Sequence, residues 1–162
     1  MIAMVKEKAC RDDDRFPKRK SPRIPGYDYA TPNYYFITIC THEKKCIFWN
    51  GNKLNNFGRI AWDAALQIPE HFPGNRVDSF VIMPNHIHMI LVVEPGGTDA
   101  TVVMGQYKSR ISKEIHKTDP EQRVWQTSFH DHGIRGYRQY LRIREYIQTN
   151  PMRWDKDCFY VE

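Results

Sequence analysis

The sequence has few cysteines, and they are not arranged for a structural role. The four cysteines, Cys10, Cys40, Cys46 and Cys158, form no CxxC pair and have no regular spacing. This pattern favours neither a disulfide framework nor a zinc site built from cysteines. We therefore expect free, reduced thiols, as in a cytoplasmic protein.

Long apolar runs are also missing. The longest, residues 80–93, is interrupted by a proline, an asparagine and two histidines, whereas a membrane-spanning helix needs about 20 consecutive apolar residues. Residues 1–14 contain no apolar stretch of the kind found in a signal peptide. We expect a soluble, cytoplasmic protein that has no membrane partner.

The excess of positive charge is small but unevenly distributed. The chain has 24 Lys and Arg against 19 Asp and Glu, which gives a net charge of +5. Prolines disfavour a helix near the N-terminus, and we expect residues 1–28 to form an extended basic arm. This arm is either a solvated tail or a contact to a nucleic-acid backbone. Its five clustered basic residues are Arg15, Lys18, Arg19, Lys20 and Arg23.

The remaining residues, 29–162, carry alternating strand and helix patterns, and we expect them to form one domain. Aromatic and β-branched runs predict four strands, over residues 34–41, 77–83, 86–93 and 124–129. Helical spacing predicts a helix over 57–68, one that carries Met104 to Ile115, and one over 137–149. The order β-α-β-β-α-β-α predicts an α+β fold: a ferredoxin-like antiparallel sheet with helices on one face and an extra C-terminal helix.

A His-x-His pattern opens the third predicted strand. Alternate residues of a strand point to the same face, so His86 and His88 stand side by side while Ile87 faces the core. Two such imidazoles can converge on one divalent metal ion, or they can simply form a polar face. A second pair, His130 and His132, has the same spacing, and spacing alone does not rank the two pairs.

The last predicted helix carries Tyr146 and Asn150 one turn apart. At 100° per residue, both lie on the border of the apolar stripe that contains Ile143 and Ile147. An amide oxygen from Asn150 could complete a metal site with two histidines, and the phenol of Tyr146 would then lie one turn away. The alternative is a helix in which the tyrosine packs and Asn150 with Pro151 only ends the helix.

The second predicted helix has basic residues outside its apolar side. They could follow a phosphate backbone, although a solvated helix face is the simpler interpretation of such a stripe. The stripe itself contains Arg110, Lys113 and Lys117, and the DNA-binding candidates on this helix are Lys108, Arg110 and Lys113.

Two segments, VIMPNHIHMILVV and REYIQTNPMRW, together resemble the signature motifs of single-tyrosine HUH transposases, in particular the REP-associated tyrosine transposases. The likeness extends from Arg19 to Trp154. The resemblance implies that His86 and His88 bind a metal ion, Mg²⁺ or Mn²⁺, and that Tyr146 is the catalytic nucleophile on the C-terminal helix. Asn150 matches the third-ligand position, where other branches of the family have Gln.

The resemblance also implies an activity. Proteins of this kind cleave and rejoin single-stranded, hairpin-containing DNA through a 5′-phosphotyrosine, without a nucleotide cofactor, so we expect an enzyme that acts at the nucleoid. The resemblance leaves open whether it works as a homodimer or a monomer. Because twelve residues follow Asn150, we expect no accessory C-terminal domain.

Two other functions compete with this one. A ferredoxin-like sheet with basic and aromatic residues could be a non-catalytic module that binds single-stranded nucleic acid. An HxH site could instead belong to a zinc hydrolase that uses water as its nucleophile. Under the transposase interpretation, His130 and His132 are polar edge residues or DNA contacts.

Overall fold

The computed structural model describes residues 24–162 and contains a four-stranded antiparallel sheet. The strands lie in the order β4-β5-β1-β6, which is the order of a ferredoxin-like sheet. The predicted fold class is therefore confirmed. The basic residues predicted in the arm, Arg15 to Arg23, lie outside the described residues. The strands are β1 (Asn33–Cys40), β4 (Asn75–Ile82), β5 (His86–Val93) and β6 (His130–Gly133).

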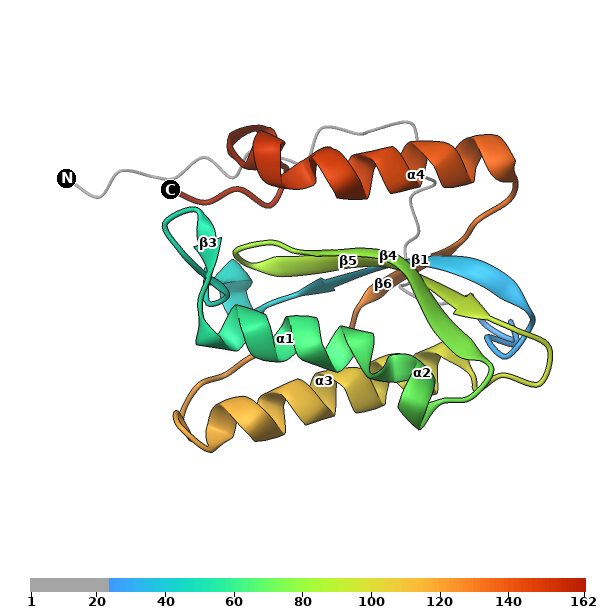
Figure 1. The fold of residues 1–162 in the computed structure, drawn as a ribbon, viewed down its shortest axis with the longest axis horizontal. Coiled ribbons are helices and arrows are strands. Elements are labelled where there is room, and N and C mark those ends of the chain that lie inside the picture. The colour runs from blue at the N-terminus through green and yellow to red at the C-terminus, as the bar shows by residue number, and fades with distance from the viewer. Residues whose placement is uncertain (1–23) are drawn as a thin grey trace.

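Helices cover both faces of this sheet (Figure 1). Three of them lie on one face: α1 (Asn56–Leu66), α2 (Ile68–His71) and α3 (Ala100–His116). The C-terminal helix α4 (Tyr137–Thr149) crosses the other face and continues into the 3₁₀-helix η2 (Asn150–Lys156). The short elements are η1 (His42–Lys44), β2 (Trp49–Asn50) and β3 (Lys53–Leu54).

Strand β5 divides its side chains between these two faces. Every residue of β5 is buried, because the strand lies between β1 and β4 and is covered above and below. Ile87, Met89 and Leu91 enter a large apolar cluster with α1 and α3, and we call this side of the sheet the core face. His86 and His88 lie on the opposite side, the site face, where Ile90, Ile143 and Ile147 form a smaller cluster under α4.

The predicted position of the fourth strand is wrong. Residues 124–129 form a loop that makes one isolated bridge, between Trp125 and Thr41, and the strand begins only at His130. Val124 and Phe129 of this loop are buried and Trp125 is half-buried, and the Trp125 indole donates a hydrogen bond to the Lys108 carbonyl of α3 at 2.9 Å. Backbone pairing in this segment is limited to that bridge, where the His42 N–H donates to the Val124 carbonyl and the Gln126 N–H to the Cys40 carbonyl.

No helix within residues 24–162 is long and apolar enough to cross a membrane. The three cysteines in this part of the chain, Cys40, Cys46 and Cys158, form no disulfide bond. Burial raises the pKa of the Cys40 thiol to about 12, so this thiol is protonated and unreactive at neutral pH.

Candidate active site

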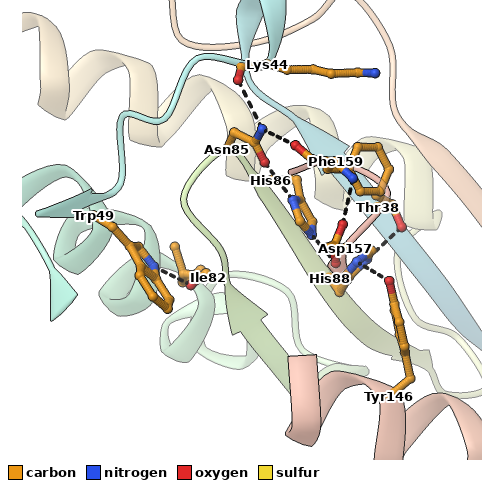
Figure 2. A network of polar contacts seen from close by, with 10 residues as sticks. All are labelled: Thr38, Lys44, Trp49, Ile82, Asn85, His86, His88, Tyr146, Asp157 and Phe159. Atoms are coloured by element: carbon orange, nitrogen blue, oxygen red, sulfur yellow. Dashed lines mark hydrogen bonds and ion pairs between the residues drawn. The ribbon is translucent and has the colours of Figure 1, made fainter. Parts of the chain in front are cut away.

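The two histidines of β5 lie side by side on the site face (Figure 2). Their ring centroids are 4.5 Å apart, and His86 and His88 are 0% and 2% exposed. Both point the same way because they are two residues apart on one strand, as the sequence predicts. The structure therefore brings both imidazoles into one buried space beneath α4.

Hydrogen bonds orient the His86 ring. The Asn85 side-chain nitrogen donates to the carbonyls of Lys44 and Phe159, at 3.0 and 2.7 Å, so the Asn85 Oδ1 faces His86. This oxygen can only accept, and it lies 2.9 Å from His86 Nδ1. The proton of a neutral His86 is therefore on Nδ1, and its Nε2 presents a lone pair to the site.

His88 is held in a similar way. Its Nδ1 lies 2.8 Å from the Thr38 hydroxyl on the neighbouring strand β1. Its Nε2 lies 3.4 Å from the hydroxyl of Tyr146 on α4. Each histidine thus uses Nδ1 to fix its ring and directs Nε2 toward the same space, which is how histidines that bind metals are usually supported.

Burial keeps both histidines neutral. It lowers the pKa of His86 well below its ordinary value, with a further contribution from neighbouring His88, and it lowers the pKa of His88 to about 3. Neutral imidazole is the form that binds a metal ion. Both rings are therefore ready to bind a metal at neutral pH without first losing a proton.

Helix α4 supplies Tyr146 at the border position that helical spacing predicts. Its neighbours Ile143 and Ile147 are buried, whereas Tyr146 is half-buried, with its ring 5.2 Å from that of His88. The ring also packs edge-on against Phe36 of β1, at 6.4 Å. These contacts hold the Tyr146 hydroxyl beside the histidines.

Asn150 lies at the end of α4, where the chain passes into η2. Its side chain is 2% exposed, and its Oδ1 has no hydrogen-bond partner. The Nε2 atom of His86 is a second buried atom without a hydrogen bond. Since a buried polar atom without a partner is costly, these two atoms are candidates for binding a ligand.

Sequence reasoning missed Asp157. The chain turns back after η2 and places this side chain, 2% exposed, with its Oδ2 3.8 Å from His86 Nε2. Potential ligand atoms of His86, His88 and Asp157 all lie within 4.8 Å of one another. Burial raises the pKa of Asp157, and hydrogen bonds from the Phe159 N–H and from the side chains of Asn150 and Tyr146 oppose this effect. No spacing rule connects Asp157 to β5, so the sequence holds no signal for this contact.

The second histidine pair lies elsewhere. His130 and His132 belong to the edge strand β6, where His130 is exposed and His132 lies 2.7 Å from the Gln139 side chain. Within residues 24–162, the group of three potential metal-binding side chains includes His86, His88 and Asp157 but neither of these histidines. The tertiary structure thus separates two pairs that sequence spacing leaves equal.

The basic candidates on α3 are not brought to this site. Helix α3 lies on the core face, across the sheet from α4 (Figure 1). Lys108 donates to the Gln126 carbonyl at 2.9 Å, and Arg110 to the Gln67 side chain at 2.5 Å, whereas Lys113 is exposed. Their role in DNA binding stays a prediction, and any DNA that they contact lies on the far side of the sheet.

Comparison with known proteins gives consistent matches. A family model described as an IS200-like transposase matches residues 33–150. An uncharacterised protein of Haemophilus influenzae is 34% identical over an alignment of 172 positions, gaps included, that covers 89% of this chain and 94% of that protein. The REP-associated tyrosine transposase of Escherichia coli is 28% identical over 80 residues, 48% of this chain and 44% of that protein.

A solved structure of a REP-associated tyrosine transposase bound to a REP hairpin has the same fold. It superimposes with a TM-score of 0.64, covering 85% of this chain and 74% of the other, at 17% sequence identity. At this level of identity the match establishes the shared fold.

Proposed function

The chain belongs to the IS200-like transposase family, and on this premise we propose that it cuts and rejoins single-stranded DNA through a covalent bond to Tyr146. The observation that carries this proposal is the position of the Tyr146 hydroxyl, 3.4 Å from Nε2 of a buried, neutral histidine. Tyrosine is a suitable nucleophile for phosphate, because the phosphotyrosine bond keeps the energy needed to rejoin the strand.

The residues of the site fit a divalent metal ion. His86, His88 and Asn150 would hold Mg²⁺ or Mn²⁺, since their nitrogen and oxygen atoms are suitable ligands and two of these atoms lack any other partner. A bound ion would neutralise the charge that develops on the phosphate. Chelation with EDTA should stop strand cleavage, and added Mn²⁺ should restore it.

In each direction, the reaction would break one bond to phosphorus and form another. The Tyr146 oxygen attacks phosphorus, the bond from phosphorus to the 3′ oxygen breaks, and the phenol proton ends on the released 3′-OH. Attack by another 3′-OH reverses these changes and rejoins the DNA, so that no nucleotide cofactor is needed. The packing of Tyr146 against Phe36 and His88 holds the hydroxyl in place for this attack.

The proposed substrate is single-stranded DNA that contains a hairpin. The related structure is bound to a REP hairpin, and the shared fold makes a hairpin the first substrate to test here. A homodimer remains a prediction that light scattering of the purified protein would test.

The position of the label on the DNA makes the test specific. A 5′-phosphotyrosine joins the protein to the fragment on the 3′ side of the cut, so a 3′-labelled oligonucleotide should give a protein-linked band on a denaturing gel. A 5′-labelled one should give a shorter, free fragment. Tyr146→Phe should lower both products at least about 1,000-fold, because the nucleophile is lost.

Tyr140→Phe is a matched control on the same helix. The Tyr140 hydroxyl donates to Asp78 at 2.9 Å and takes no part in the proposed site, so this variant should cleave normally. Cleavage by Tyr146→Phe at the wild-type rate would contradict the assignment.

The same gel separates the two rival functions. A non-catalytic binding module would retain the DNA uncut. A zinc hydrolase would cut it without a protein-linked band, and Tyr146→Phe would leave its activity unchanged.

A further inference from the structure

The segment that follows η2 is part of the wall of the site. The Phe159 ring packs on the His86 ring, with centroids 4.5 Å apart, and the Phe159 carbonyl accepts a hydrogen bond from Asn85. The Phe159 N–H donates to Asp157 Oδ1 at 2.7 Å, which fixes the carboxyl group. Figure 2 shows the result: Asp157 lies between this segment and the two histidines.

The contact between Asp157 and His86 is not an ordinary hydrogen bond. Since Asn85 Oδ1 accepts the proton on His86 Nδ1, the nitrogen that faces Asp157 carries a lone pair. Asp157 Oδ2 is also an acceptor when the carboxyl group is ionised. Two lone-pair atoms 3.8 Å apart in a buried space repel each other unless a proton or a metal ion lies between them.

The distances suit a metal ion. Ligands on opposite sides of an octahedral Mg²⁺ lie about 4 Å apart, because each is roughly 2.0–2.1 Å from the ion. The ligand atoms of His86, His88 and Asp157 lie within 4.8 Å of one another, so small side-chain movements would close the site. We propose that Asp157 is a further ligand of the divalent cation, added to His86, His88 and Asn150.

This proposal deepens the proposed function and predicts a property of the site. A carboxylate is a hard ligand with a negative charge, so its presence favours Mg²⁺ and Mn²⁺ over softer metals. It also makes metal binding depend on the segment after α4, which must be folded against β5 to deliver Asp157.

Binding of Mn²⁺ without DNA tests the proposal directly. The affinity would be measured by titration with Mn²⁺, followed by electron paramagnetic resonance of the free ion. Asp157→Asn keeps an oxygen that can accept the Phe159 N–H, so the segment should stay in place. It should bind Mn²⁺ at least about 10-fold more weakly, because even the loss of a residue that only supports a ligand costs 10- to 100-fold.

Asp155→Asn is the matched control, because Asp155 lies two residues away and is exposed. It should bind Mn²⁺ as the wild type does. Thermal unfolding adds a second readout: Mn²⁺ should raise the melting temperature of the wild type and of Asp155→Asn more than that of Asp157→Asn. In the metal-free state Asp155→Asn should unfold at the wild-type temperature, and Asp157→Asn should be no less stable, because it removes the charge that faces the His86 lone pair.

Three outcomes would overturn the proposal. Equal Mn²⁺ affinity in both Asn variants would mean that Asp157 does not bind the ion. Loss of metal-free stability in Asp157→Asn, with unchanged affinity, would identify an ion pair with a protonated His86. Tighter binding and faster cleavage by Asp157→Asn would mean that the carboxylate blocks the site.

The test of the proposed function and the test of the Asp157 assignment can fail separately. If the wild type forms no protein-linked band but Asp157→Asn loses Mn²⁺ affinity, the cleavage mechanism fails and the ligand assignment stands. If the protein-linked band forms and both Asn variants bind Mn²⁺ equally, the cleavage mechanism stands and the assignment of Asp157 as a ligand fails.

Discussion

The two faces of the sheet are built from the same strands but differ in chemistry. On the core face, Ile87, Met89 and Leu91 pack with α1 and α3 in an extensive apolar cluster. On the site face, the alternate positions of β5 carry His86 and His88, covered by α4. Side chains on both faces are buried, yet unpaired polar atoms such as His86 Nε2 occur on the site face.

This difference separates stability from function. Apolar burial on the core face stabilises the sheet, and the sheet in turn holds His86 and His88 in a fixed relation. The site face keeps polar atoms in a buried space at a cost in free energy, which a bound ligand would recover. Substitutions on the two faces should therefore have different effects.

Met89→Ala on the core face should cause the largest loss of stability. It removes a fully buried side chain and leaves a cavity, so the free energy of unfolding, measured in urea, should fall by about 2–5 kcal/mol. Asn150→Leu on the site face should lower metal-free stability by less, about 1–2 kcal/mol, because loss of its hydrogen bond to Asp157 is partly offset by removal of a buried oxygen without a partner. The same variant should lose Mn²⁺ binding. Equal destabilisation by both changes would contradict the distinction between the faces.

Low pH should lower the stability of the protein, because it favours protonation of His88 on the site face. The pKa of His88 is about 3 in the folded state and near 6.5 when unfolded, so the unfolded state binds more protons between these values. Stability is therefore complete above about pH 6.5 and falls as the pH decreases, by about 2 kcal/mol at pH 5 from this residue alone. Urea unfolding of the metal-free protein at pH 5 and pH 8 measures this difference in the free energy of unfolding. His88→Gln should show a smaller difference between the two pH values.

The basic arm should affect DNA affinity and not the chemical step. Each phosphate contact contributes about 0.7–0.9 to the slope of log affinity against log salt, so an arm with two to four contacts contributes roughly 2–3 units. Deletion of residues 1–23 should flatten the slope for hairpin DNA by this amount. Cleavage at saturating protein should persist, because the proposed catalytic residues lie elsewhere. Equal slopes would identify the arm as a solvated tail.

Lys113→Ala should have the smallest effect and would test whether DNA reaches the core face. The side chain is exposed on α3, and α3 lies across the sheet from α4, the helix that carries Tyr146. Loss of one phosphate contact should weaken hairpin binding slightly and reduce the salt slope by about 1 unit at most. Cleavage at saturating DNA should not change. A large loss of cleavage would mean that α3 contributes to catalysis, contrary to its position.

The sequence by itself determined which residues share a face. A period of two on β5 and of 3.6 on α4 placed His86 beside His88, and Tyr146 on the border of the helix, because these relations depend only on local backbone geometry. Likewise, the order of the elements predicted the ferredoxin-like sheet.

Only the tertiary structure decided which distant residues meet. It placed Asp157 against His86, bonded Lys108 to the Gln126 carbonyl, and limited the strand pairing of residues 124–129 to one bridge. It also separated the His86 pair from the His130 pair, which look alike in the sequence. Such contacts depend on chain reversals and on packing between elements, and neither has a local pattern that spacing along the chain could reveal.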